Sequence, residues 1–264
     1  MEVLMEKRIM LVSAVFLAAC LGVSASASIG TPTAGLGQGQ WSLGFDYTYS
    51  TQDLDKIKMK GSDESEKYKN RDFNVNRYYG VLSYGLTEEW EVSAKVGIAD
   101  VKTQLKGEGD DEWSGHNFDN DIAWGWGTKV TFLKQEKCDW GASLQMNWLN
   151  TSWDQKYEDG KESIDIDTYD LLIAVGPTVD MGGWKLYGGP FFYYLSGDVD
   201  WKGSETDEDD GLVTWKVSGD LRAKSNFGGY IGAQFELAKN WDAGVEFSLT
   251  GDGWGLGTGI TFKF

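Results

Sequence analysis

The chain has 264 residues, a formal net charge of −17, many glycine and aromatic residues, and only three prolines. So acidic a chain argues against nucleic acid as a partner. Beyond the N-terminus no stretch reaches the roughly 18 apolar residues of a membrane-spanning helix, so a place in a membrane would require a β-barrel.

The N-terminus has the features of a targeting segment. Lys7 and Arg8 precede a short apolar run, and small residues follow it. This pattern predicts a secretory signal peptide over residues 1–27, cleaved after Ala27. A competing interpretation is that Leu17-Ala18-Ala19-Cys20 resembles the lipobox of bacterial lipoproteins, which implies cleavage before Cys20 and lipidation of its thiol.

Residues 28–39, rich in Gly and Thr, are expected to form a flexible lead-in. From residue 40 to 264 the sequence alternates between apolar and polar residues in short runs, which is the period of β-strands. The alternation predicts ten strands, at about residues 41–49, 77–85, 90–98, 122–132, 140–148, 168–179, 184–194, 227–237, 241–249 and 254–264.

The connections between these strands are of two kinds. Tight turns alternate with long, charged segments that are expected to be loops, at about residues 51–72, 99–120, 151–165 and 196–225. An antiparallel up-and-down barrel would carry these tight turns at one end and the long segments at the other, where only the last connection, at residues 251–253, is short. Both ends of the chain would then lie at the end with the tight turns.

Tryptophan marks the start of every odd-numbered strand, on the side of the tight turns and always on the apolar phase. These residues are Trp41, Trp90, Trp140, Trp184 and Trp241. Tryptophan suits a membrane–water boundary because its ring is apolar while its N–H seeks water. The five therefore predict an interfacial girdle at one rim.

The polar face of the strands consists mainly of Gly, Ser, Thr, Asn and Gln, with few charges. A water-facing exterior would carry more Lys and Glu, so the apolar face is expected to meet lipid and the polar face to line the lumen. Pro177 and Pro190 fall within strands, where each removes a ladder donor, and local bulges are expected there.

The last strand, Trp254 to Phe264, alternates fully and ends on an aromatic residue. It resembles the closing strand of small Gram-negative outer-membrane β-barrel proteins. The resemblance covers about residues 40–264, and it implies an integral outer-membrane barrel whose assembly signal, Phe262 with Phe264, is recognised by the barrel-assembly machinery. The tight turns would then be periplasmic and the long acidic loops extracellular.

Ionisable residues of both signs point into the predicted lumen. They are Asp46, Arg77, Glu91, Lys95, Lys129, Asp170, Lys185, Glu236, Asp242, Glu246 and Lys263. Burial behind a wall of low dielectric constant requires them to pair. Glu91, Lys185, Glu236, Asp242 and Lys263 should form one layer near the periplasmic rim, which could act as a structural plug or as a selectivity constriction.

Three functions remain open at this point. The first is a non-enzymatic barrel with a narrow or plugged lumen, whose loops form an interaction face toward an unknown extracellular partner. The second is a narrow porin-like channel for small solutes. The third is a surface hydrolase, for which the chain offers a single histidine, His116, near Ser114. No catalytic residue, cofactor or metal site is assigned, since the acidic loops lack a recognisable ligand spacing.

Overall fold

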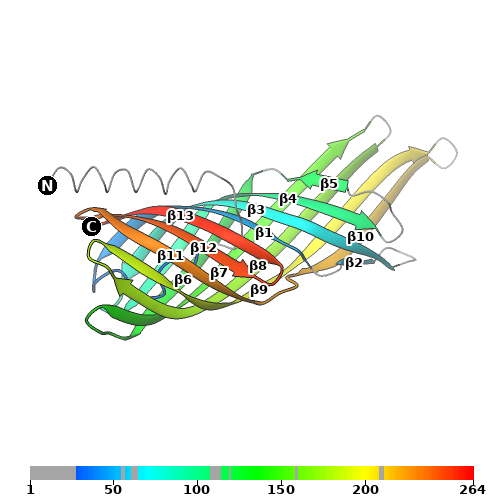
Figure 1. Cartoon of the computed structure of the whole chain (residues 1–264). Coiled ribbons are helices and arrows are strands. Elements are labelled where there is room, and N and C mark those ends of the chain that lie inside the picture. Colours follow the sequence, from blue (N-terminus) through cyan, green and yellow to red (C-terminus); the bar gives the residue numbers. More distant parts are fainter. Residues whose placement is uncertain are drawn as a thin grey trace, which may run out of the picture.

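The computed structural model describes residues 28–54, 57–60, 65–107, 114–118, 120–157, 160–207 and 211–264 (Figure 1). The predicted signal peptide and Cys20 lie outside these residues. The strands are β1 (Trp41–Gln52), β2 (Ile57–Lys60), β3 (Ser65–Gly85), β4 (Trp90–Gly107), β5 (Ser114–Asn117), β6 (Asp121–Leu133), β7 (Cys138–Lys156), β8 (Gly160–Asp180), β9 (Trp184–Asp207), β10 (Gly211–Arg222), β11 (Phe227–Ala238), β12 (Trp241–Thr250) and β13 (Gly253–Lys263).

Ten of these strands close into one antiparallel barrel. Around the wall the order is β1, β3, β4, β6, β7, β8, β9, β11, β12 and β13, and β13 pairs with β1 from Ser42↔Lys263 to Gln52↔Gly253. All ten correspond to strands expected from the sequence, so the predicted barrel is confirmed. The described part of the chain contains no helix long and apolar enough to cross a bilayer.

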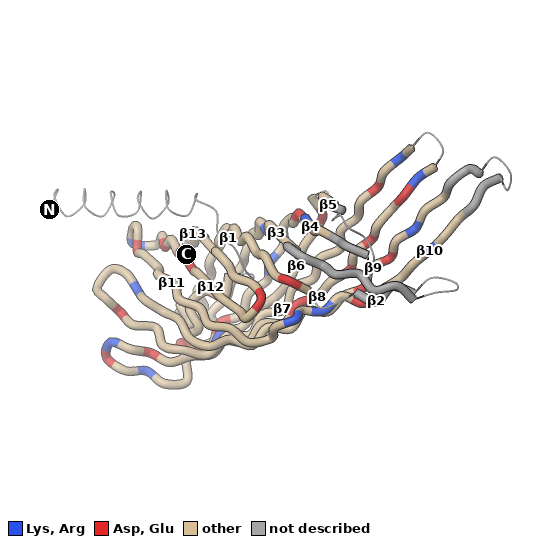
Figure 2. Tube along the Cα trace, turned by 45° about the vertical axis from the view of Figure 1, so that its right-hand side comes forward, with Lys and Arg blue, Asp and Glu red and all other residues tan. Residues whose placement is uncertain are grey.

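In the half of the wall nearest the tight turns, apolar side chains face outward. Leu43, Val96 and Ile231 are 57%, 64% and 55% exposed, and Phe247 is also exposed. Small and polar residues face inward at the same height, so the expected orientation of the two faces is correct. Charged positions are concentrated in the tight turns and on the projecting strands at the other end (Figure 2).

The segments expected to be long loops are largely strands. β7 and β8 stay paired from Cys138↔Val179 as far as Lys156↔Lys161, and β9 continues to Asp207 before β10 pairs back along it. β10 also pairs with β2, and β5 pairs with the end of β4. The loop prediction was therefore wrong over most of these residues, and two long hairpins project from the barrel (Figure 1).

The reason lies in a reversal of the alternation beyond the membrane. On β8 the outward residues change from Leu171 and Tyr169 to Asp167 and Asp165, and on the inner face Ile166 and Ile164 are buried. The period of two continues, but the apolar residues move to the opposite phase because water replaces lipid outside. Because these segments are rich in acidic residues, they were predicted to be loops, and the reversal of the alternation was not recognised from the sequence.

The two in-strand prolines lie where the wall is interrupted. Pairing between β8 and β9 stops after Ala174↔Phe191 and resumes at Thr178↔Tyr187, and Pro177 and Pro190 fall in that gap. Proline cannot donate to the ladder, so an irregularity is expected at these positions. The pairing resumes in the same register, so no residue is inserted, and the local bulges expected from the sequence are not found between these two strands.

Candidate functional site

The N-terminal segment, residues 28–37, lies inside the barrel in the half nearest the tight turns. The backbone N–H groups of Ile29 and Gly30 donate to the two carboxylate oxygens of Glu246, at 2.7 and 2.8 Å. Gly35 N–H donates to Glu91 Oε2 at 2.9 Å, and Ile29 is 1% exposed. The sequence predicted a flexible lead-in here and gave no sign that it enters the lumen.

Two further hydrogen bonds hold the middle of this segment to the barrel wall. Ala34 N–H donates to Thr131 Oγ1 at 3.0 Å, and Thr33 Oγ1 donates to Thr178 Oγ1 at 2.9 Å. The segment is thus held in turn by β12, β8, β6 and β4 before it joins β1. We call residues 28–37 the plug segment.

Glycines on the inner wall make room for the plug segment. A side chain at Gly257 would meet the Cβ of Ser28 at 2.8 Å, and one at Gly85 or Gly141 would meet the backbone of Gly37 or Pro32. Glycine allows this close approach because it has no Cβ. The plug segment therefore explains Gly257 on the polar phase of the last strand, whereas a side chain at Gly259 would meet Asp46.

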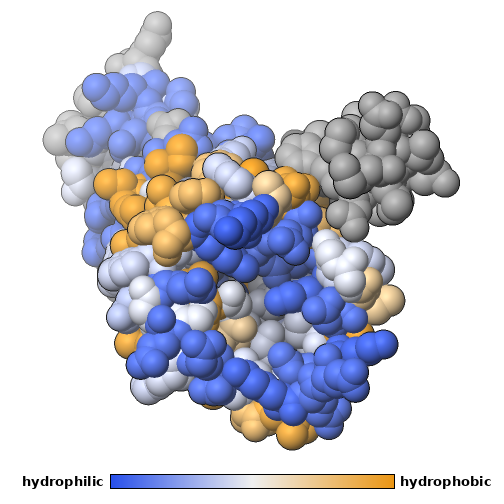
Figure 3. All heavy atoms as spheres, turned by 90° about the vertical axis from the view of Figure 1, so that its left-hand side faces the viewer, coloured by the Kyte–Doolittle hydropathy of each residue, from blue (hydrophilic) through white to orange (hydrophobic). Residues whose placement is uncertain are grey.

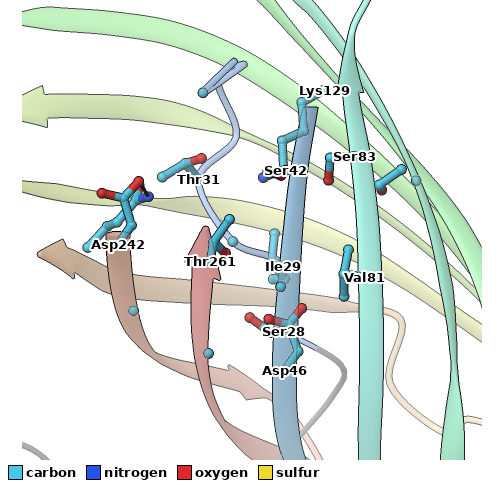
Figure 4. Close-up of a pocket in the computed structure, with 18 of the residues that line it drawn as sticks. Ser28, Ile29, Thr31, Ser42, Asp46, Val81, Ser83, Lys129, Asp242 and Thr261 are labelled. Carbon is cyan, nitrogen blue, oxygen red and sulfur yellow. Dashed lines mark hydrogen bonds between the residues drawn. The ribbon is translucent and has the colours of Figure 1, made fainter. Parts of the chain in front are cut away.

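Charged residues surround the plug segment. Lys95 Nζ donates to Gln145 Oε1 at 2.7 Å, and Gln145 Nε2 in turn donates to the carbonyl oxygens of Ser28 and Ile29, at 3.1 and 2.7 Å. These groups line a cavity of about 140 Å³, with Asp46 on its wall (Figure 4).

Two ion pairs join four of the predicted lumen residues. Lys129 lies 3.8 Å from Glu91, and Lys263 lies 2.7 Å from Asp242. Lys185 and Glu236 line a second cavity of about 210 Å³ at the rim, together with Asp242 and Lys263. Four members of the predicted charge layer thus meet at this rim cavity, whereas Glu91 lines the inner cavity instead.

The rim itself is hydrophilic. Figure 3 views the barrel from the end that carries the tight turns. Polar residues encircle the mouth of the barrel there, while apolar residues lie on its outer flanks. This distribution follows from the alternation of the strands and from the charged turns that join them.

At mid-height an ion pair crosses the lumen. Arg77 on β3 and Asp170 on β8 lie 3.1 Å apart, and both side chains are almost fully buried. Asn147 donates to the second carboxylate oxygen of Asp170 at 2.7 Å. Tyr79 and Tyr193 are buried beside the pair. Because β3 and β8 stand far apart around the wall, their side chains bridge the barrel interior.

Above this pair the interior is apolar. It is filled by side chains from β3, β4, β7, β8, β9 and β10, namely Phe73, Val75, Ala99, Val101, Leu149, Ile164, Ile166, Leu195, Val199 and Leu221. All are at most 4% exposed. We call this group the outer core. Sequence reasoning missed it because half of these residues fell within the predicted loops and the others lay between those loops and the predicted strands.

The tryptophans predicted to form a girdle lie near the tight turns and point outward. Trp41, Trp90, Trp140 and Trp241 are 39–46% exposed, and Trp184 is half-buried. Trp90 Nε1 donates to Thr128 Oγ1, at 2.7 Å. Their role at the lipid boundary stays a prediction.

The end of the last strand is held at the same rim. Phe264 exchanges two backbone hydrogen bonds with Trp41, at 3.0 and 3.2 Å, while its ring is exposed. Phe262 lies between Trp241 and Leu43 in the register. Recognition of Phe262 and Phe264 by the assembly machinery likewise stays a prediction. The backbone of His116 lies in β5 opposite Thr103.

A closed up-and-down barrel with an apolar outward belt defines an integral protein of the bacterial outer membrane. The chain belongs to the outer membrane protein beta-barrel domain family, whose model matches residues 81–262. No curated protein matches this chain.

Several solved structures are similar to it. The outer membrane protein OprG from Pseudomonas aeruginosa is 11% identical, with a TM-score of 0.47 over 87% of this chain and 98% of its own. The outer membrane protease OmpT from Escherichia coli is 10% identical, with a TM-score of 0.49 over 90% and 99%. The attachment protein Ail of Yersinia pestis is 14% identical, with a TM-score of 0.31 over 86% and 99%.

Proposed function

We propose that this protein is a closed, non-enzymatic outer-membrane barrel whose projecting hairpins form a cell-surface interaction face. The observation that carries the proposal is that the interior is filled at three successive heights. The plug segment occupies the inner half, the Arg77–Asp170 pair crosses the middle, and the outer core fills the remainder. An open solute path would have to pass all three.

The projecting hairpins support the second part of the proposal. Their inner faces are apolar and packed, whereas their outer faces carry charges such as Asp167, Asp198 and Lys216. A packed core makes the projections rigid platforms instead of mobile loops, and rigid surfaces lose less conformational entropy when they bind a partner. The overall negative charge favours a partner with cationic groups.

Reconstitution in planar bilayers tests the closed lumen. We expect the purified protein to give no steady single-channel current. Steady currents that change with Lys95→Ala or Glu246→Ala would show a solute path through the inner half, and the narrow-channel alternative would replace this proposal.

Shortening the β7–β8 hairpin tests the interaction face. Ser152 and Asp165 are paired, so residues 153–164 can be replaced by a two-residue Asn-Gly turn that suits a hairpin. Cells displaying the full-length barrel should bind at least one surface in a panel of immobilised matrix proteins and glycans, and cells with the shortened barrel should lose that binding. Heat-dependent gel mobility checks that the shortened barrel still folds.

Two results would count against the interaction face. One is that cells with the full-length barrel bind no better than cells lacking it, and the other is that the shortened barrel binds equally well. The hydrolase alternative has its own test, since His116→Ala would abolish any hydrolysis that depends on that residue.

A further inference from the structure

The inner cavity carries an excess of negative charge. Four carboxylates line it, Asp46, Glu91, Asp242 and Glu246, against three ammonium groups, Lys95, Lys129 and Lys263. Glu91 and Asp242 have ion-pair partners in Lys129 and Lys263. Lys95 is the one ammonium group of the lining that is left for Asp46 and Glu246, so one negative charge is formally unmatched among the described residues that line the cavity.

Ser28 lies close to both Asp46 and Glu246, so a positive charge on Ser28 would be close to these two carboxylates. Its Cβ lies against Gly257 on the inner face of β13, and Asp46 lies against Gly259 on the same face (Figure 4). Residues two apart on a strand are separated by about 7 Å. The Ser28 nitrogen is also within about 7 Å of the Glu246 carboxylate, because Ile29 N is bonded to it and consecutive residues advance by about 3.8 Å.

The residues next to Ser28 are held by hydrogen bonds to their backbone, and the side chain of Ile29 is buried as well. Glu246 accepts from the N–H groups of Ile29 and Gly30, and Gln145 donates to the carbonyls of Ser28 and Ile29. Such contacts fix the position of the chain independently of residue type. Capture of an amino terminus by converging backbone and side-chain polar groups is a known mode of recognition.

We propose that the lumen is a binding site for the protein's own processed amino terminus, the α-ammonium of Ser28, with Asp46 and Glu246 as its counter-ions. The sequence predicts cleavage after Ala27. An envelope peptidase adds water across the Ala27–Ser28 bond: the hydroxyl goes to the Ala27 carbonyl carbon, the C–N bond breaks, and the Ser28 nitrogen leaves as an amine that is protonated below about pH 8. Processing thus creates the cation that completes the inner half.

The first test is the intact mass of the protein isolated from outer membranes. A chain that begins at Ser28 with a free amine is expected. A chain that begins at a lipidated Cys20, or that keeps residues before Ser28, would overturn the proposal.

The second test separates charge from bulk. Chains beginning at Ser28 are refolded in detergent with either a free or an acetylated α-amine, in the wild type and in an Asp46→Asn, Glu246→Gln background. Acetylation should lower the unfolding midpoint of the wild type by about 3 °C or more, and by less than half as much in the double variant. Glu88→Gln is the matched control, because Glu88 accepts a hydrogen bond from the backbone N–H of Gln38 at the exposed rim. In this background acetylation should lower the unfolding midpoint as much as in the wild type.

An equal shift in both backgrounds, or no shift at all, would show that the amine has no ionic partner in the lumen. If the double variant fails to refold, the reactivity of the wild-type amine decides the question. Modification by a small amine-reactive ester at pH 8 should be at least tenfold slower in the folded barrel than in urea. Equal rates would contradict the proposal.

Discussion

The inner and outer halves of this barrel are filled in different ways. In the inner half the wall contributes glycines, hydroxyls and charges, and the plug segment fills the space through hydrogen bonds to Glu246, Glu91 and Thr131. In the outer half the wall fills the space itself, with apolar side chains from six strands. The same ladder of strands therefore encloses an inserted ligand-like segment below and an ordinary hydrophobic core above.

The difference shows how the surroundings set the inside of a β-barrel. Where lipid surrounds the wall, the outward face must be apolar and polar residues are left to the lumen. Where water surrounds it, charges move outward and the interior can become a conventional core. The contents of the inner half could leave without breaking the wall, whereas the outer core cannot be emptied without unfolding the projecting strands.

The boundary between the halves should be the most sensitive point. Arg77→Met leaves the buried Asp170 carboxylate without its ion-pair partner, and breaking a buried pair on one side costs about 3–5 kcal/mol. We expect a loss of that size in urea unfolding monitored by gel mobility. Arg77→Met with Asp170→Leu should recover most of it, and failure to recover would mean that the pair has another role.

A cavity in the outer core should cost nearly as much. Leu195 is 2% exposed, and truncation of a buried leucine to alanine costs about 2–5 kcal/mol. Leu195→Ala should lower the free energy of unfolding accordingly. Leu249→Ala removes the same atoms from an outward position that is 53% exposed, and an equal loss there would show that the outer core is not the main source of stability in that half.

The division between the halves also explains what the sequence could predict. Strand number, the outward face and the tight-turn rim followed from alternation and from five tryptophans in phase, because lipid imposes one simple rule on every strand it touches. The outer core did not follow, because Ile164, Ile166 and Val199 alternate with Asp residues in segments whose acidity suggested loops. A search for a reversal of phase within each long connection would have found them.

The plug segment could not be predicted for a different reason. Residues 28–37 are mostly small and carry no charge, so nothing in them indicates a partner. Their partners are spread over the wall, on β4, β6, β7, β8 and β12, and only closure of the barrel brings these together. Gly257 was the one signal on the last strand, since a lumen position without a side chain leaves space for another segment, here Ser28.

Loosening the plug segment should have a moderate and local effect. Glu246→Gln removes the charge and one of the two acceptors for Ile29 and Gly30, and a buried donor left unpaired costs about 1–3 kcal/mol. We expect faster hydrogen exchange at these two amides while the exchange of barrel strands stays unchanged. Glu236→Gln, on the exposed rim, is the control and should leave both amides protected. A uniform increase over the whole barrel would mean that Glu246 supports the wall and not the plug segment.

The smallest effect concerns a pair outside the membrane, on the projecting β9–β10 hairpin. Ser218 Oγ donates to Asp200 Oδ1 at 2.6 Å, and this bond, together with Lys216 at 3.0 Å, holds the pKa of Asp200 below its ordinary value. A lowered pKa contributes stability that is present above the ordinary Asp value and is lost as pH falls through the folded-state value.

Ser218→Ala should therefore raise the pKa of Asp200 toward its ordinary value, as measured by NMR titration of the carboxyl carbon. Because the pair is partly exposed, the stability at neutral pH should fall by less than about 1 kcal/mol. Thr214→Ala removes an exposed hydroxyl from the same strand as Ser218 and should leave the pKa of Asp200 unchanged. An unchanged Asp200 pKa in Ser218→Ala would mean that the neighbouring lysines, and not the hydrogen bond from Ser218, hold the pKa of this carboxyl down.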